Sequence, residues 1–275
     1  MVLLHVKQSE DSQFLCELTV NTPVPDAIKE LVAINNLRHR LHRLKLEGEE
    51  LAKYGPAKPL EEQGIDEYQE NVVKGEHYLM DPTGRRTGNA CAPEAAKTLL
   101  KTLADGEQAG HKSQADRKVP LTLAKLEEAL DNIRGGVMIA YPVGLPEWDL
   151  VRQALEGKEE LAGSSHAADD MDPETTTLWF AGKQMLLQNK LSDHVGRHEK
   201  SKVVVKLQRK GQGAPGREPP VDAETQKAMM AFYHKKQEEQ KRLMEDQYED
   251  YTNSVWANPK ALKSHFSGVG NVKIR

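Results

Sequence analysis

Two short stretches near the start of the chain alternate apolar and polar residues. The apolar positions of the first are Val2, Leu4 and Val6, and those of the second are Phe14, Cys16, Leu18 and Val20. A period of two residues is typical of strands with one buried face, and the polar residues between the two stretches suit a turn. The pattern predicts a β-hairpin. It also places Cys16 on the inward side, where a thiol is more often a core residue than a reactive one.

A helical period follows the hairpin. After the punctuation Thr22-Pro23-Val24-Pro25-Asp26, apolar residues recur at helical spacing, at Ile28, Leu31, Val32, Ile34 and Leu41. A hairpin followed by such a helix is how a β-grasp (ubiquitin-like) domain begins, although many other α+β domains begin in the same way. The order of elements favours an α+β fold class with an N-terminal β-grasp-like domain.

The middle of the chain reads as an insertion into that domain. Residues from about 46 to 120 combine Gly/Pro-rich loops with a helix that Pro93 begins. Thr122 then caps a helix whose apolar face is Leu123, Leu126, Leu130 and Ile133, and Gly135-Gly136 stops it. The apolar run 137–141 is predicted to be a buried strand in the same sheet as the hairpin. Residues 1–155 are therefore predicted to form one domain with a long insertion.

The remaining residues, 172–275, are predicted to form a mainly helical C-terminal region. Asp172-Pro173-Glu174 has the residue types that start a helix: a cap, a first-turn proline and an acid. A strand-like run at 203–207 leads into a basic Gly/Pro loop. Asp222 then caps a long polar helix to about Met244 whose apolar side is thin, and an extended tail follows.

Charge and cysteine content narrow the class of function. The 275 residues carry a net charge of -4 and a pI near 6.2, which gives no global attraction to nucleic acid or to an anionic membrane. Two cysteines are too few for a disulfide framework, and no apolar run approaches the roughly 20 residues of a membrane span. We expect a reduced, intracellular protein that binds neither nucleic acid nor membrane.

Gly211, Gly213 and Gly216 have the G-x-G-x-x-G spacing of a dinucleotide site, just after the strand-like run. That fingerprint needs a helix directly after the glycines, so that its amides face the pyrophosphate. Pro215, and Pro219-Pro220 beyond it, instead favour extended backbone. The sequence therefore predicts no nucleotide cofactor here. A flexible basic loop that binds an acidic protein surface and a solvated linker are about equally good interpretations.

Two further patterns have unremarkable explanations. His194 and His198 have the i, i+4 spacing of two metal ligands, but the glutamate of H-E-x-x-H is missing and no third ligand is evident. The basic run 38–45 lacks aromatic residues that would stack on bases, and it is placed at the end of the predicted helix, where cations favour the helix dipole. No nucleophile lies beside an evident base. We expect no metal, no cofactor and no enzymatic activity.

The turn at 141–149 is the best candidate for recognition of another protein. Tyr141, Trp148 and Asp149 lie around two prolines and a glycine, in Tyr141-Pro142-Val143-Gly144-Leu145-Pro146-Glu147-Trp148-Asp149. Rigid aromatic side chains on a proline-bounded loop suit protein interfaces. Equally, both rings suit a cap over the domain core, and the sequence leaves the two readings open.

Three blocks of the sequence resemble a known family. "RGGVMIAYPVGLPEWD", "LSDHVGRHEKSKVVVKLQRKGQGAPGREP" and "NSVWANPKALKSHFSGVGNVK", with the opening "MVLLHVK", are similar to the Kurly family, also called cilia- and flagella-associated protein 298. The resemblance runs from the first residue to the last. It is weakest at about 45–120 and at 155–172.

The resemblance implies a non-enzymatic protein needed for motile cilia. Such a protein supports cytoplasmic assembly of axonemal (outer) dynein arms and ciliary orientation, through contacts with dynein assembly factors or dynein chains. The alternative is a structural component bound stably to the axoneme. Either implies the cytoplasm or the cilium, at the axoneme or basal body, as its location. The recurrent blocks nominate these interaction residues: Tyr141, Trp148, Asp149, Gly213, Arg217, Glu218, Trp256 and Phe266.

Overall fold

The computed structural model describes residues 1–9, 11–64, 74–161, 163–216 and 223–253, the last with side chains to 242. The chain divides into two compact units, Met1–Gly216 and Arg217–Arg275. This division falls well beyond the predicted boundary between residues 155 and 172, because strands from 176–209 complete the N-terminal sheet. Each unit is described by itself below.

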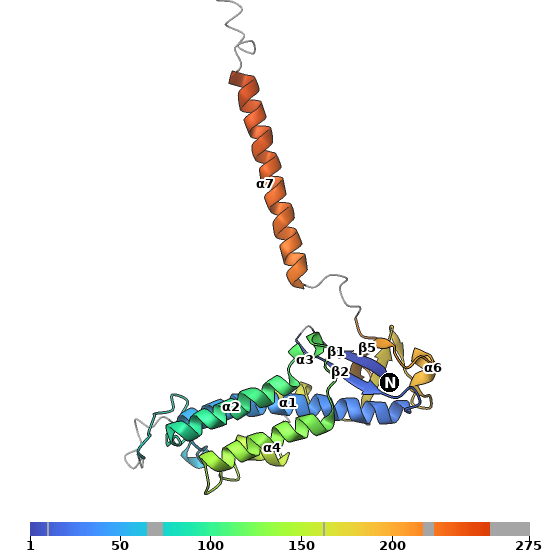
Figure 1. Ribbon diagram of the computed structural model, residues 1–275. Coiled ribbons are helices and arrows are strands. Elements are labelled where there is room, and N and C mark those ends of the chain that lie inside the picture. Colours follow the sequence, from blue (N-terminus) through green and yellow to red (C-terminus); the bar gives the residue numbers. More distant parts are fainter. Residues whose placement is uncertain (10, 65–73, 162, 217–222, 254–275) are drawn as a thin grey trace, which may run out of the picture. The chain divides into compact units, whose positions relative to one another are not determined.

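The first unit contains a five-stranded mixed sheet (Figure 1). Its strands are β1 (Val2–Lys7), β2 (Gln13–Leu18), β3 (Thr176–Phe180), β4 (Lys183–Gln184) and β5 (Lys202–Arg209). The order is β2-β1-β5-β3-β4; β1 and β5 are parallel, and the other pairs are antiparallel. A hairpin, a helix and a parallel central pair in this order are the topology of a β-grasp domain. The predicted α+β class with a β-grasp-like N-terminal domain is confirmed.

The alternation in the sequence corresponds to the buried face of this sheet. Val2, Leu4 and Val6 are fully buried, and in β5 the buried Val203 and Val205 flank Val204, which is 45% exposed. Cys16 is 1% exposed, so its predicted place in the core is confirmed. Because the thiolate would be charged in an apolar interior, burial raises the pKa of Cys16 to about 12.

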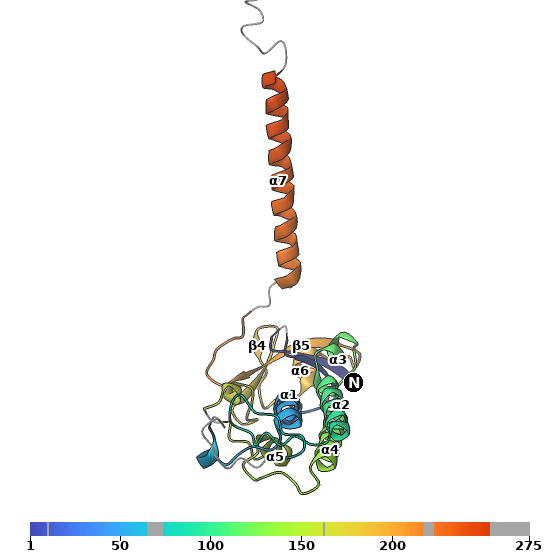
Figure 2. The same ribbon diagram turned by 90° about the vertical axis from the view of Figure 1, so that its left-hand side faces the viewer.

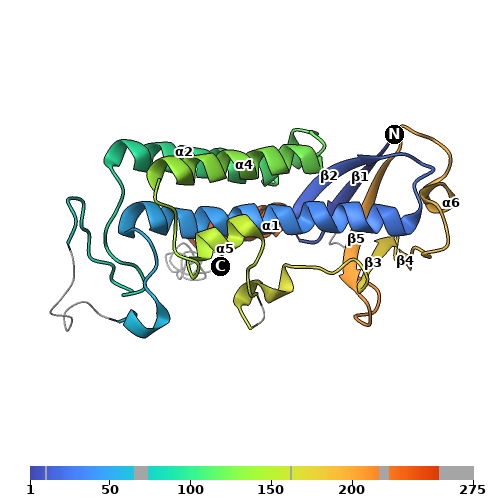
Figure 3. The ribbon, with the colours of Figure 1, turned by 90° about the horizontal axis from the view of Figure 1, so that it is seen from below.

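Helix α1 (Val24–Tyr54) is long enough to pack against both the sheet and the other helices of the unit. Its 31 residues make it about 46 Å long. The first half crosses one face of the sheet, and the second half continues beyond the sheet beside three other helices (Figures 2 and 3). These are α2 (Pro93–Gly110), α4 (Leu123–Ala140) and α5 (Leu150–Glu156). Gly48 permits the close approach to α2, since an added Cβ would lie 2.6 Å from Leu103 Cδ1.

The residues between α1 and β3 form the insertion, and it is more helical than predicted. Besides α2, α4 and α5 it holds the short helices η1 (Leu60–Glu62), α3 (Ser113–Asp116) and η3 (Ser165–Ala168). The predicted strand at 137–141 is wrong, because residues 137–140 form the last turn of α4. Gly136 does not stop that helix. It lies against α2, where an added Cβ would be 2.5 Å from Thr102 Oγ1.

The predicted helix after Asp172 is also wrong. The Asp172 carboxylate accepts the Glu174 N–H at 3.1 Å, which caps a single turn, and β3 follows at once. The β-branched Thr176 and Thr177 begin this strand, and they are opposite Arg209 and Gln208 of β5. After β4 the chain forms α6 (Leu191–Val195) and then returns as β5.

The second unit contains one described element, helix α7 (Ala223–Asn253). The predicted long polar helix is thus confirmed, and it runs nine residues past Met244. Four large apolar side chains near its start are exposed, namely Met229, Met230, Phe232 and Tyr233. Of the nominated interaction residues, Arg217, Glu218, Trp256 and Phe266 lie outside the described residues, as does the backbone predicted to be extended after Gly216.

Candidate protein-interaction site

One segment of the first unit exposes several large apolar side chains. This segment, residues 138–150, comprises the last turn of α4, the turn after it and the first residue of α5. Its exposed apolar side chains are Met138 (65% exposed), Ile139 (64%), Val143 (100%), Trp148 (46%) and Leu150 (37%). Exposed apolar residues scattered singly are normal, but so many from thirteen consecutive residues indicate a contact surface.

The 138–150 segment is fixed to the rest of the unit by its two rings. The Tyr141 hydroxyl donates to the Leu51 carbonyl at 2.9 Å, and the Trp148 indole N–H donates to the Ala57 carbonyl at 2.9 Å. Burial raises the pKa of Tyr141, which keeps its hydroxyl a donor. Tyr141 is half-buried against the core, whereas the Trp148 ring remains nearly half exposed. The two aromatic residues therefore differ: Tyr141 mainly braces the segment, and Trp148 is available to a partner.

The prediction that Asp149 contacts a partner is wrong, because this residue is fully buried. Its carboxylate accepts the Val151 N–H at 2.9 Å, which caps α5, and the Ala57 N–H at 2.9 Å. Its Oδ2 also lies 3.6 Å from Nη1 of Arg86. The role of Asp149 is to join α5 to the chain that follows α1.

Arg86, the centre of this buried network, was not predicted as a functional residue from the sequence. Its guanidinium is 3% exposed and donates to the Gly55 carbonyl at 3.1 Å and to the Glu47 carboxylate at 2.9 Å. It therefore ties the end of α1 to the loop before α2. The only signal was the turn-forming Asp81-Pro82-Thr83-Gly84 before it, and that pattern carries no information on distant partners.

The basic Gly/Pro loop after β5 is described as far as Gly216. Gly213 is exposed with φ 79°, a conformation that favours glycine, and the space around it is open. Arg209 donates to the carbonyls of Ala167 and Asp170, each at 2.8 Å, and Lys210 donates to the Glu174 carbonyl. Part of the positive charge predicted for this loop is thus used to bind the unit's own backbone.

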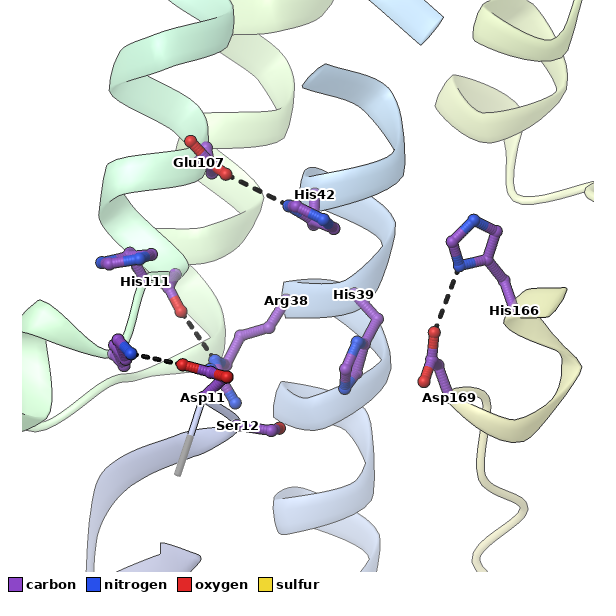
Figure 4. A pocket seen from close by; sticks show the side chains of 11 residues that line it. Asp11, Ser12, Arg38, His39, His42, Glu107, His111, His166 and Asp169 are labelled. Atoms are coloured by element: carbon purple, nitrogen blue, oxygen red, sulfur yellow. Dashed lines mark hydrogen bonds and ion pairs between the residues drawn. The ribbon is translucent and has the colours of Figure 1, made fainter. Parts of the chain in front are cut away.

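A charged pocket of about 430 Å³ lies between α1, α2, the β1–β2 turn and the turn at η3 (Figure 4). Its wall residues carry many ionisable groups: Asp11, Arg38, His39, His42, Glu107, His111, Lys112, His166 and Asp169. The predicted position of the basic run 38–45 at a helix end is wrong, since α1 continues to Tyr54. In the described parts of the chain, no three side chains are grouped as metal ligands.

The carboxylates of this pocket already have cationic or histidine partners. Asp11 accepts from Lys112, and Asp169 lies 3.2 Å from the His166 ring. Glu107 lies 2.6 Å from Lys45 Nζ and 3.1 Å from the His42 ring, and the hydrogen bonds from both lower the pKa of Glu107 against the effect of burial. Asp11 and Glu107 are therefore compensated by lysines, whereas the charge of Asp169 is compensated only when His166 is protonated.

Comparisons with known proteins identify the family. A family model described as cilia- and flagella-associated protein 298 matches residues 176–272. Cilia- and flagella-associated protein 298-B of Xenopus laevis is 39% identical over 275 residues, covering 99% of this chain and 98% of the relative. The protein of that family name from Homo sapiens is 39% identical over 288 residues, and that from Drosophila melanogaster 35%, each with 100% of this chain and 99% of the relative covered. The chain belongs to this family.

Membership of the cilia- and flagella-associated protein 298 family confirms the resemblance found in the sequence blocks, and the relatives' names support a role in cilia. The family model spans β3, β5 and the basic loop, and it includes the nominated Trp256 and Phe266. No solved structure matches significantly. Among the helices that the structure describes, none has the length and apolar character needed to cross a bilayer.

Proposed function

We propose that this chain is a non-enzymatic factor for motile cilia. In this proposal it supports cytoplasmic assembly of axonemal outer dynein arms, and ciliary orientation, by binding dynein assembly factors or dynein chains. The observation that carries the proposal is the 138–150 segment, whose apolar side chains are exposed on a braced turn. Membership of a family named for cilia and flagella supports the ciliary setting.

Proximity labelling in cells that are building cilia tests the surface. Val143→Ser changes a side chain that is 100% exposed, so it should leave the fold intact and remove labelling of dynein chains or assembly factors. Trp148→Ala should have the same effect on labelling. The matched control is Leu60→Ser, because Leu60 is 82% exposed but lies outside the segment. Unchanged labelling with both folded variants would show that another surface binds the partner.

Cell fractionation tests where the protein acts. An assembly factor is extracted with the detergent-soluble cell body, whereas a structural component stays with axonemes washed in salt. We expect the chain in the soluble fraction. Recovery mainly in washed axonemes would replace the assembly role with the structural one.

A further inference from the structure

Among the described residues that line the charged pocket, Arg38 is a cation without an ion-pair partner. Arg38 is 9% exposed and lines the pocket, and among the described residues no carboxylate forms an ion pair with it. Its Nε donates to the Gly110 carbonyl at 2.7 Å, while the buried Nη1 finds no hydrogen-bond partner in the described part of the chain. Burial lowers the pKa of Arg38 to about 10, which still leaves the group charged at neutral pH. A buried charge in this state is unfavourable unless something else binds it.

Two contacts hold the Arg38 guanidinium in a fixed position. The Gly110 carbonyl orients one edge, and the Phe14 ring lies beneath it, 4.9 Å from Cζ to the ring centroid. Neither contact involves the two outer nitrogens, and among the described residues the buried Nη1 has no acceptor. A guanidinium fixed in this way favours binding of an oxyanion, because its parallel N–H groups can donate to two oxygens of one ligand.

His39, next in sequence, adds a second unsatisfied group to the same wall. Its Nε2 is buried and has no hydrogen-bond partner among the residues that the structure describes. In Figure 4 its ring lies on the side of α1 that faces His166 and Asp169. Burial and the neighbouring Arg38 and Arg43 lower the pKa of His39, although Asp169 opposes them. The ring is therefore a neutral hydrogen-bonding group, and Arg38 is the one charge that a ligand must neutralise.

We propose that this pocket binds a carboxylate group on Arg38. A ligand with one negative charge suits this pocket better than one with two, because three carboxylates of the described residues already line it. Asp11 is paired with Lys112, Glu107 with Lys45, and Asp169 lies beside the His166 ring. A phosphoryl dianion would add excess negative charge next to those three acids. The carboxylate comes either from an acidic side chain of another polypeptide or from a free carboxylic acid. The inference does not depend on the ciliary role.

Binding is measured on the full chain by calorimetry and by ¹⁵N–¹H NMR. The probes are an acetylated and amidated Gly-Glu-Gly peptide, sodium glutarate, and inorganic phosphate. We expect saturable binding of a carboxylate probe at millimolar concentration, with shifts centred on the Arg38 Nε–H and on the amides of Ser12, His39 and Gly110. Tighter binding of the peptide would identify a polypeptide as the source, and tighter binding of glutarate a free acid. Phosphate binding more tightly than either would overturn the proposal, as would shifts centred elsewhere or no saturable binding.

Variants separate the pocket from general effects of charge. Arg38→Met keeps an apolar stem on Phe14 and should reduce affinity at least tenfold, and Arg38→Lys should reduce it less. Arg43→Met is the matched control, because Arg43 is equally buried on the same helix but is paired with Glu159 at 2.6 Å. It should bind the carboxylate probes as the unaltered chain does. Equal loss in both variants would contradict the assignment to Arg38. If Arg38→Met does not fold, Arg38→Lys and the shift map of the unaltered chain still decide the question.

Discussion

The buried carboxylate of Asp149 leads to the strongest stability prediction. Asp149→Ala removes the cap of α5, worth about 1 kcal/mol. It also leaves the Ala57 N–H without its acceptor, which costs about 1–3 kcal/mol in the interior. Arg86, 3% exposed, loses one of its nearby negative charges as well. We expect a loss of about 3–5 kcal/mol in the free energy of unfolding, a loss typical of mutations that break a buried hydrogen-bond network.

Urea unfolding followed by circular dichroism measures this loss, with thermal melting as a second reading. For a unit of this size the loss corresponds to a fall in Tm of roughly 6–20 °C. Asp149→Asn should lose about half as much, because the amide oxygen still accepts one N–H but carries no charge. The control is Glu147→Ala, a neighbouring acid that is exposed and should change stability by less than about 0.5 kcal/mol.

A free energy of unfolding for Asp149→Ala within about 1 kcal/mol of that of the unaltered chain would contradict this prediction. Equal destabilisation by Glu147→Ala would contradict it too, since burial would then not be the cause. If the Asp149→Ala chain is folded but no longer binds its partner proteins, Asp149 would have to be counted again among the interaction residues.

Two further predictions concern the first unit. In the folded chain, a thiol reagent at pH 8 should modify the partly exposed Cys91 quickly and Cys16 only on unfolding. The reason is that burial raises the pKa of Cys16 to about 12. Fast modification of Cys16 in a folded Cys91→Ser variant would contradict this. Gly55→Ala combines φ 77° with a Cβ 2.1 Å from the Asn89 carbonyl oxygen, whereas Gly144→Ala has φ 89° and open space. Chemical denaturation should show Gly144→Ala losing about 1–2 kcal/mol and Gly55→Ala clearly more; equal losses would mean that the contact with Asn89 relaxes.

The sequence predicted elements whose evidence is local. The hairpin follows from a period of two, the start of α1 from proline punctuation and a helical period, and the long α7 from the polar run after Asp222. The run 137–141 misled the prediction because an apolar run after two glycines looks the same whether it ends a helix or forms a strand. The close contact of Gly136 with Thr102 decides between them, and that contact joins separate helices.

In the candidate sites, too, the sequence predicted what neighbouring residues determine and not what distant contacts determine. The exposed Trp148 was found because aromatic residues beside prolines are visible in sequence, but the burial of Asp149 depends on Ala57 and Arg86. The two buried arginines of the basic run look alike in sequence. Arg43 is paired with Glu159, 116 residues away, and Arg38 is not paired among the described residues. Only the fold distinguishes a compensated charge from one that is free to bind.

The parallel pairing of β1 with β5 has a consequence for how the protein is made. Leu3 lies opposite Lys202, so the central pair of the sheet closes a chain of about 200 residues. Helices of the insertion form from nearby residues and have no such delay. During translation, β1 and its hairpin emerge well before β5, and one edge of β1 lacks its hydrogen-bonding partner until residue 209 has been synthesised. Nascent chains stalled before β5 should therefore be the species most prone to aggregate and most dependent on chaperones.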